Sequence, residues 1–149
     1  MADKPKFNPE KLAIIDFKLI KGQVDAPEEF DAEVVKGYRL NNNFQLGFNL
    51  KVKQAKADLT IEVDSDSKGE NTEEAKAVFH LIFIFKVENL DELVTETDAK
   101  KLNVDPMLGS SLAGISYSTA RGILLTRLQG TVFQKFILPV INPSQLLAK

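Results

Sequence analysis

The stretch FQLGFNLKV, residues 44–52, decides the fold, because apolar and polar side chains alternate along it without interruption. A period of two places every apolar side chain on one face, which is typical of a strand with one buried face. Residues 57–64, with the sequence ADLTIEVD, alternate in the same way. The polar run from Ser65 to Thr72, with Gly69 inside it, predicts a flexible hairpin connection after this second stretch.

Two further stretches are apolar on both sides of the predicted strand. Residues 77–87, AVFHLIFIFKV, carry large apolar side chains on both faces, so a strand here must be covered on both. Residues 12–20 begin in the same way. Alternation divides their apolar side chains into one face with Ala13, Ile15, Phe17 and Leu19 and another with Leu12, Ile14 and Ile20. The sequence therefore predicts four antiparallel strands.

A connection of about twenty residues, from Gly22 to Asn43, separates the first predicted strand from the second, which is long for a compact domain. It contains Phe30 and Tyr38 among acidic residues. We therefore expect an ordered crossover rather than a disordered loop.

The last third of the chain predicts two helices. Asp105 followed by Pro106 is a helix start, because the Asp oxygen caps unpaired N–H groups and proline lacks the N–H that would remain unpaired. The helix should run to about Gln129 and end at Gly130. Small residues crowd its first half, which suits the close approach of a partner copy. Asn142 and Pro143 repeat the start signal before a short last helix. We predict an α+β fold, with both helices on one face of the sheet, in a single domain over residues 1–149.

Composition excludes several classes of function. Lys and Arg number 19 against 21 for Asp and Glu, so there is no basic excess to bind nucleic acid. The chain has no cysteine, which excludes disulfides, thiolate nucleophiles and Cys-based metal sites. Residues 1–10 are polar with two prolines, unlike a signal peptide or a membrane span. We expect a cytoplasmic protein that does not insert into membranes.

Candidate catalytic groups are few. His80 is the only histidine, and it stands between Phe79 and Leu81 in the most apolar strand, so we interpret it as a packed or interface residue. The acidic residues of the 64–74 region do not keep the spacing of a calcium loop. Asp16 is the other candidate for an enzyme. We predict no catalytic residue, no metal and no cofactor, and hence a protein that is not an enzyme.

The order of features in the last third of the chain resembles SecB, the bacterial protein-export chaperone family. The pattern consists of an aromatic residue, Ala-Arg, an amphipathic helix, Gly-Thr, an apolar Pro-Val segment and a last helix. Here these are Tyr117, Ala120, Arg121, Ile123 to Leu128, Gly130, Thr131, Leu138 to Val140, and Pro143 to Leu147. The resemblance implies a SecB-like fold and places Arg121 in a structural pair with a neighbouring strand or subunit.

The resemblance also implies a function. It implies a holdase that binds unfolded or precursor polypeptides in an apolar groove, with free sheet edges beside it, and that assembles as a homotetramer. The family contacts the SecA motor partly through a basic, metal-binding C-terminal tail. The sequence ends at Lys149 without one, so SecA is a doubtful partner and a toxin–antitoxin role stays open. An adaptor that keeps the fold for assembly alone and a small-ligand-binding protein on a similar scaffold also stay open as functions.

The predicted substrate-binding residues are the large apolar side chains that the strand pattern does not assign to the core: Phe30, Tyr38, Phe133, Phe136, Ile137 and Leu147. For Phe133, Phe136 and Ile137 a core position is an equally good interpretation. Exposed apolar surface of this kind marks a site for apolar partners.

Overall fold

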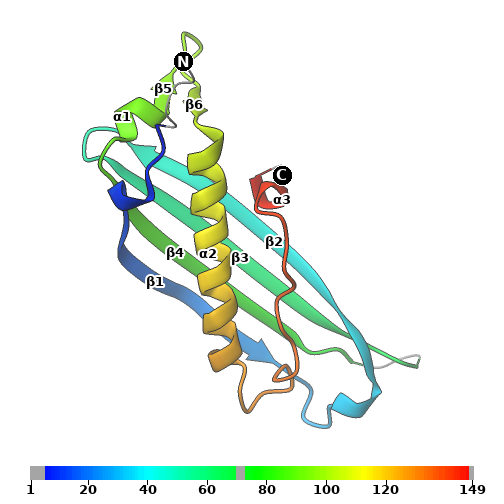
Figure 1. Ribbon diagram of the computed structural model, residues 1–149. Helices are drawn as coiled ribbons and strands as arrows, with labels where there is room; N and C mark the ends of the chain where they lie inside the picture. Colours follow the sequence, from blue (N-terminus) through cyan, green and yellow to red (C-terminus); the bar gives the residue numbers. More distant parts are fainter. Residues whose placement is uncertain (1–5, 70–72, 148–149) are drawn as a thin grey trace.

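The computed structural model describes residues 6–69 and 73–147. Four long strands, β1 (Leu12–Asp25), β2 (Val35–Asn49), β3 (Gln54–Ser67) and β4 (Lys76–Val87), form one antiparallel sheet. A long helix, α2 (Pro106–Arg127), and a short helix, α3 (Ser144–Leu147), lie on one face of it (Figure 1). The predicted α+β architecture is confirmed. Residues 1–5, 70–72 and 148–149 fall outside the described residues, and with them part of the predicted 65–72 connection and the predicted end of the last helix.

The strand order is β1-β4-β3-β2, so β1 and β2 form opposite edges of the sheet although they are consecutive in sequence. The chain passes from one edge to the other through residues 26–34, which include the 3₁₀ turn η2 (Ala32–Val34), at one end of the sheet (Figure 1). The predicted crossover from Gly22 to Asn43 is therefore too long. Most of that range belongs to β1 and β2.

A polar residue and a bulge concealed the full length of β2 in the sequence. Tyr38, Leu40, Phe44 and Phe48 lie in one row that faces α2, but Asn42 occupies the middle of this row. A β-bulge between Val35 and Gly37 shifts the pattern again at the start of the strand. A polar residue and a bulge together remove the period-two signal on which the sequence analysis relied.

The predicted assignment of β1 side chains to two faces is wrong because the strand contains two bulges. The pairing with β4 shifts between Ile14 and Asp16 and between Leu19 and Lys21, so Ile15 and Ile20 are the extra residues. Consequently Leu12, Ile14, Phe17 and Leu19 all pair with residues on the helix-facing side of β4. The sets predicted by simple alternation are wrong because each bulge reverses the parity of the residues that follow.

The core lies between the sheet and α2. Every second residue of β3 and β4 is buried there, and α2 contributes one apolar stripe to the same layer. The largest fully buried side chains include Phe83, Phe85, Leu59, Leu81, Leu108 and Leu112. The opposite face of β4, with Val78, Ile82 and Ile84, is only half-buried, and no described element of this chain covers it.

Helix α2 begins as predicted. The Asp105 carboxylate accepts hydrogen bonds from the backbone N–H groups of Met107 (2.9 Å) and Leu108 (3.4 Å), and Pro106 occupies the first turn. The helix ends at Arg127, and Gly130 follows with φ of 78°, a left-handed conformation that favours glycine.

Two small residues of α2 lie against this chain's own C-terminal region. A Cβ atom placed on Gly114 would lie 3.3 Å from Cγ of Pro143, and one on Gly109 would lie 3.4 Å from Cδ1 of Leu147. Pro143 therefore packs beside Gly114, while Gly114, Ser111 and Ser118 also line an open hollow next to β1, so the close approach of a partner copy to this helix stays a prediction.

Three short elements between the sheet and α2 were not predicted: α1 (Leu90–Leu93), β5 (Val94–Glu96) and β6 (Leu102–Val104). β5 and β6 pair as a separate two-stranded ribbon, and Asp105 at its end donates its backbone N–H to the Leu93 carbonyl oxygen. Elements of three or four residues are too short for a period of two or 3.6 to be visible in the sequence.

Candidate functional site

The C-terminal segment, residues 137–147, runs beside β2 on the helix-bearing face (Figure 1). Two hollows lie along it. The first, the Tyr38 hollow, has a volume of about 420 Å³. Its walls come from β2 and from the chain after α2: Tyr38, Leu40, Lys135, Phe136, Ile137 and Pro139. The structure thus brings three of the predicted binding residues to one concave surface.

An aromatic cluster forms the base of the Tyr38 hollow. The Tyr38 ring lies 5.1 Å from the Phe136 ring in an edge-on arrangement and 5.9 Å from the Phe133 ring, measured between centroids. Such pairs stabilise each other by about 0.5–1.5 kcal/mol beyond the area they bury. The cluster holds Tyr38 in place, and Tyr38 also lines the hollow.

The turn after α2 sets the direction of these rings. The Thr131 hydroxyl donates to the Leu128 carbonyl oxygen (2.7 Å) and accepts from the Phe133 N–H (3.1 Å), and the Phe136 N–H donates to the Phe133 carbonyl oxygen (2.8 Å). As a result Phe133 is 0% exposed and Phe136 is 7% exposed, whereas Ile137 is 60% exposed. Phe133 is therefore a core residue beneath the hollow. Ile137 is the member of this trio that a bound chain can reach.

The second hollow, the Leu147 hollow, has a volume of about 400 Å³ and lies near the start of α2. Leu147 is 38% exposed at its wall. The other lining residues are Leu46, Phe48, Leu102, Val104, Asp105, Pro106 and Gly109. Leu46 and Phe48 continue the β2 row that contains Tyr38 and Leu40, so both hollows open along the same strand.

The residues of β2 between the two hollows are covered. Asn42 and Phe44 are buried, and α3 contacts β2. The C-terminal segment is fixed above them by the Tyr117 hydroxyl, which donates a 2.6 Å hydrogen bond to the Pro139 carbonyl oxygen. Asn42 also bonds to the Tyr117 side chain. Burial raises the pKa of Tyr117, against the opposing effects of the nearby Arg121 charge and the Asn42 bond, so the hydroxyl remains a donor at neutral pH.

Phe30 is not part of this surface. It lines a different hollow of about 500 Å³ at the β1–β2 connection, where most of its neighbours are acidic: Glu28, Glu29, Asp31 and Glu73, with Pro27 and Val34. The sequence placed Phe30 with Tyr38 because both were assigned to one crossover. Since Tyr38 lies in β2 instead, the two residues separate.

Sequence reasoning missed Leu40, Leu46, Phe48, Lys135 and Pro139 as lining residues. Leu46 and Phe48 were recognised as strand residues, and a half-buried face was then interpreted as core. The relevant signal was the position of β2 at the sheet edge, which leaves the ends of its inward row open, and that position cannot be read from one strand alone.

The candidate catalytic residues do not form an active site. His80 Nε2 lies 2.7 Å from Asp58 Oδ1 on the sheet face away from α2, and both side chains are about one third exposed. Asp16 accepts a hydrogen bond from the adjacent Phe17 N–H. In residues 6–69 and 73–147, no group of three or more His, Asp or Glu side chains is placed to hold a metal ion.

Arg121 makes its ring contact within its own helix, and its predicted pairing with a neighbouring subunit stays a prediction. Its guanidinium lies over the Tyr117 ring, 5.8 Å from the centroid, and it has no carboxylate partner among the described residues. This placement is a cation–π contact between two residues one turn apart on α2.

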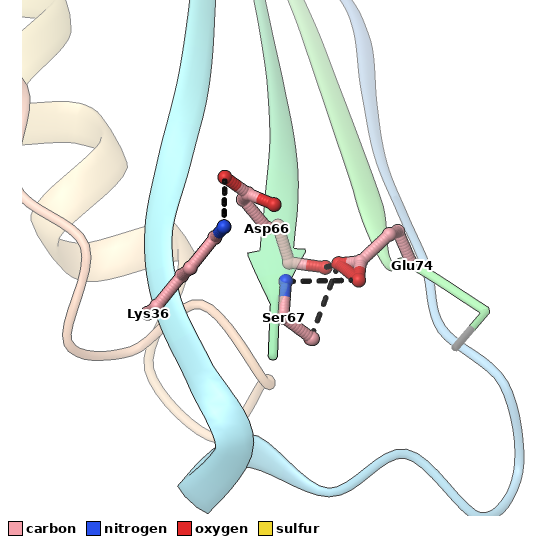
Figure 2. Close-up of polar contacts among 5 residues, drawn as sticks. Lys36, Asp66, Ser67 and Glu74 are labelled. Carbon is pink, nitrogen blue, oxygen red and sulfur yellow. Dashed lines mark hydrogen bonds and ion pairs between the residues drawn. The ribbon is translucent and has the colours of Figure 1, made fainter. Parts of the chain in front are cut away.

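Polar contacts join β3 and the start of β4 next to the turn that connects them. The Glu74 carboxylate accepts from the Ser65 hydroxyl (2.7 Å), the Ser67 N–H (2.9 Å) and the Ser67 hydroxyl (3.2 Å), beside a Lys36–Asp66 ion pair of 3.8 Å (Figure 2). The Ser65 hydrogen bond has the largest effect and lowers the pKa of Glu74; burial opposes it, and the Ser67 bonds and the Arg39 charge lower the pKa further. These contacts are structural and lie away from both hollows.

Another hollow, of about 620 Å³, lies between β1 and the middle of α2. Its lining is mostly apolar, with hydroxyl groups along one side of the helix, and includes Phe7, Leu12, Ile14, Phe85, Ile115, Ser111, Ser118 and Thr119. Among the helices in the described part of the chain, none is long and apolar enough to cross a membrane.

Among the comparisons with known proteins, only the one with solved structures gives a match. No family model matches the chain, and no curated protein does. Among solved structures, the chain is similar to the Mycobacterium tuberculosis SecB-like chaperone Rv1957, solved in complex with a ChAD peptide from the Rv1956 HigA1 antitoxin. The TM-score is 0.60 at 11% sequence identity, over 89% of this chain and 92% of that chain. At this identity the likeness concerns the backbone arrangement, and it shows that the chain has a SecB-like fold.

Proposed function

We propose that this chain is a SecB-like chaperone that holds unfolded or precursor polypeptides on the apolar surface between β2 and the C-terminal segment. The observation that carries the proposal is the pair of apolar hollows along β2, on a fold shared with a chaperone that was solved with a bound peptide. Tyr38, Phe136, Ile137 and Leu147 are the proposed contact residues, with Phe133 supporting them from below.

A holdase needs affinity but no chemistry. It acts by mass action, because a partner that binds the unfolded state lowers the concentration of unfolded chain available to fold or aggregate. The proposed protein is accordingly a cytoplasmic binding protein that uses no cofactor and is not an enzyme. Phe30, with its acidic surroundings, is proposed as a more distant contact for a client that also carries positive charge.

The proposal includes assembly into a homotetramer. Ile14, Ile15, Phe17 and Ile20 on β1 are exposed, and the outer face of β4 is only half-buried. Apolar surface of this extent on one chain is typical of an interaction surface. Light scattering tests this part: a monomer at micromolar concentration contradicts the assembly but leaves the binding surface as it stands.

The client class admits two versions. The Mycobacterium chaperone was solved with an antitoxin peptide, which favours a client of the toxin–antitoxin kind over general export through SecA. Pull-down of SecA by the purified protein is the test that separates them. Binding to SecA supports the export version, and binding to an antitoxin segment alone supports the other.

An aggregation assay tests the proposed function itself. A reduced, unfolded client protein should remain in solution when this protein is added in equimolar amount, without nucleotide. If light scattering by the client rises at the same rate with and without it, the chaperone proposal is wrong.

A small-ligand-binding protein is the second candidate function, and the hollow of about 620 Å³ between β1 and α2 is the observation that favours it. Its volume lies within the range for small-molecule sites, and its hydroxyl groups would orient an amphipathic ligand. A second copy that covers β1 and α2 would close the same hollow. A thermal-shift screen with fatty acids and aromatic acids decides between the two functions, because a ligand that raises the melting temperature by several degrees favours the small-ligand site.

A further inference from the structure

The outer face of the sheet, the face opposite α2, carries an apolar line along β4. Val78, Ile82 and Ile84 belong to this face and are half-buried, and His80 stands among them. Helices α2 and α3 lie on the other side of the sheet (Figure 1), so no described element of this chain covers the line. Uncovered apolar surface is typical of an interaction site. The charges beside the line indicate which partner fits it.

Four charged side chains surround the middle of the apolar line, and their signs alternate. The strand register places them in two neighbouring rows across the sheet: Lys56, Ile84 and Asp16 in one row, and Asp58, Ile82 and Lys18 in the next. Each row runs from β3 across β4 to β1. The first row has its positive charge on β3, and the second has it on β1. Opposite charges therefore alternate both along the strands and across the line.

Three of these four charges have no ion-pair partner in the part of the chain that the structure describes. The ion pairs there are Lys36–Asp66, Lys76–Glu62 and His80–Asp58. Asp58 is the fourth charge, and only its Oδ1 atom lies against His80, at 2.7 Å. A carboxylate accepts further hydrogen bonds on its second oxygen. All four groups can therefore pair with charges from another molecule.

A second copy of the same face is complementary to this arrangement. In a two-fold dimer one patch contacts the same patch of the other copy, so the patch has to complement itself. A two-fold axis parallel to β4 lays β4 on β4, and β3 on β1 of the second copy. Lys56 then meets Asp16 of the second copy, and Asp58 meets Lys18, and symmetry repeats both pairs. Ile82 and its counterpart meet at the centre.

The rows beside this centre fit the same arrangement. Glu62 meets Gln23 of the second copy, and Lys21 meets Thr60, so neither charge meets one of its own sign. Sheets that pack face to face cross at about 30°. The rows therefore stay in register near the centre and diverge toward Lys76, which moves the like charges of that end apart.

The size of the outer face agrees with a stable dimer. β4 has 12 residues. Four strands of this length, about 4.8 Å apart and with about 3.3 Å per residue, cover roughly 750 Å². A standard protein interface buries about 800 Å² on each partner. An axis perpendicular to β4 through the centre would leave the Lys76 end of both copies uncovered, so the axis parallel to β4 buries the larger area.

We propose that two copies of this chain associate through their outer sheet faces, about a two-fold axis parallel to β4. The contacts between the copies are Lys56 with Asp16 and Lys18 with Asp58, around a centre of isoleucines. The inference rests on the homotetramer of the proposed function and assigns one of its interfaces. Both hollows beside β2 lie on the opposite face of the sheet and stay open to a client.

Charge reversal tests the contact between the copies. Lys56→Glu places a negative charge against Asp16 of the second copy at two symmetric positions, and like charges in contact weaken association strongly. We expect a dissociation constant raised at least about ten-fold and, by light scattering at low micromolar concentration, a species of half the native mass. Lys101→Glu is the matched control, because Lys101 is also exposed but lies in the β5–β6 connection. If Lys56→Glu keeps the native mass, the interface is wrong.

Exchange of two charges tests the direction of the axis. The double variant Lys56→Glu, Asp16→Lys restores opposite charges across an axis parallel to β4, so the native mass should return. Across a perpendicular axis Lys56 faces Asp58 of the second copy instead, and the double variant stays dissociated. That result would overturn the proposed arrangement. Melting curves of both variants show whether they are folded, and we expect both to melt like the native protein because Lys56 and Asp16 are exposed.

Failure of this inference differs from failure of the proposed function. If the native protein assembles and Lys56→Glu assembles equally well, the assembly uses other surfaces, and only this inference is wrong. A native protein that is monomeric overturns the proposed assembly and this interface together. If the native protein assembles and Lys56→Glu dissociates it, but the native protein fails to suppress client aggregation, the chaperone proposal is wrong and the interface stands.

Discussion

The Tyr117 hydroxyl and the Pro139 carbonyl oxygen are joined by a 2.6 Å hydrogen bond that ties the middle of α2 to the C-terminal segment. Tyr117→Phe removes the donor and keeps the ring. We expect a loss of about 1 kcal/mol in the free energy of unfolding and a melting temperature lower by about 2–4 °C. Calorimetry measures both, and an unchanged melting temperature would show that the bond does not hold the segment.

Tyr117 also makes the stability of the folded protein depend on pH in the alkaline range. Because burial raises the pKa of Tyr117 above its ordinary value of 10.0, the folded state favours the protonated form. The stabilisation is complete below the unfolded pKa and is lost as the pH rises through the raised pKa. We therefore expect the difference in stability between the native protein and Tyr117→Phe to shrink above pH 10.0. Urea titrations on both proteins across that range check the sign.

Ile137 and Val140 form a matched pair for the binding surface. Both are exposed, at 60% and 81%, but only Ile137 lines the Tyr38 hollow. We expect Ile137→Ser to weaken binding of an unfolded client roughly ten-fold through lost apolar burial, and Val140→Ser to leave it unchanged. Both variants should melt like the native protein because neither side chain is in the core. Equal effects on client affinity would argue against the hollow as the contact.

Substitutions at Gly114 and Gly122 test whether Pro143 of the C-terminal segment packs against α2. Nothing lies within 4 Å of a Cβ atom on Gly122, whereas Pro143 lies 3.3 Å from one on Gly114. Gly122→Ala should stabilise the protein by up to about 1 kcal/mol through helix propensity. Gly114→Ala should gain less or lose, since Pro143 has to move. The same rise in melting temperature for both would mean that Pro143 does not pack there.

Glu74 should make the stability of the folded protein decrease at acidic pH. Its pKa is lowered by the Ser65 and Ser67 hydrogen bonds, so its contribution is present above the ordinary value of 4.5 and is lost as the pH falls through the lowered pKa. Glu74→Gln should therefore be less stable than the native protein at neutral pH, with a smaller difference at about pH 3. Glu73→Gln is the control, because Glu73 is exposed and makes none of these bonds. If both variants lose equally, the bonds to Ser65 and Ser67 are not the cause.

The sequence predicted the elements whose periodicity is long and uninterrupted. Residues 57–64, the stretch up to Val87 and the Asp105–Pro106 helix start all emerged with the expected faces or ends, because a single local rule governs each of them. β1 and the first half of β2 did not. Bulges at Ile15 and Ile20 and the polar Asn42 are local exceptions whose effects depend on the partner strands, which a sequence pattern does not contain.

The candidate site was predictable in composition but not in geometry. Tyr38, Phe136 and Ile137 were selected as apolar residues left over by the strand pattern, and they meet at one hollow. Phe133 and Ile137 are close in sequence and similar in character, yet one is buried and the other exposed. The Thr131 hydrogen bonds decide between them, and turn geometry of this kind is not encoded in hydrophobicity.

The strand order has a consequence for how the chain folds during synthesis. β1 is made first, but its partner is β4, so Leu12 meets Val87 only after β2 and β3 have been made. β2 and β3, in contrast, are joined by a short turn and can pair at once. Because contacts between distant residues form slowly, we expect the β2–β3–β4 meander to form first and the closure by β1 to limit the folding rate. Until then, the apolar residues of β1 are exposed on the nascent chain.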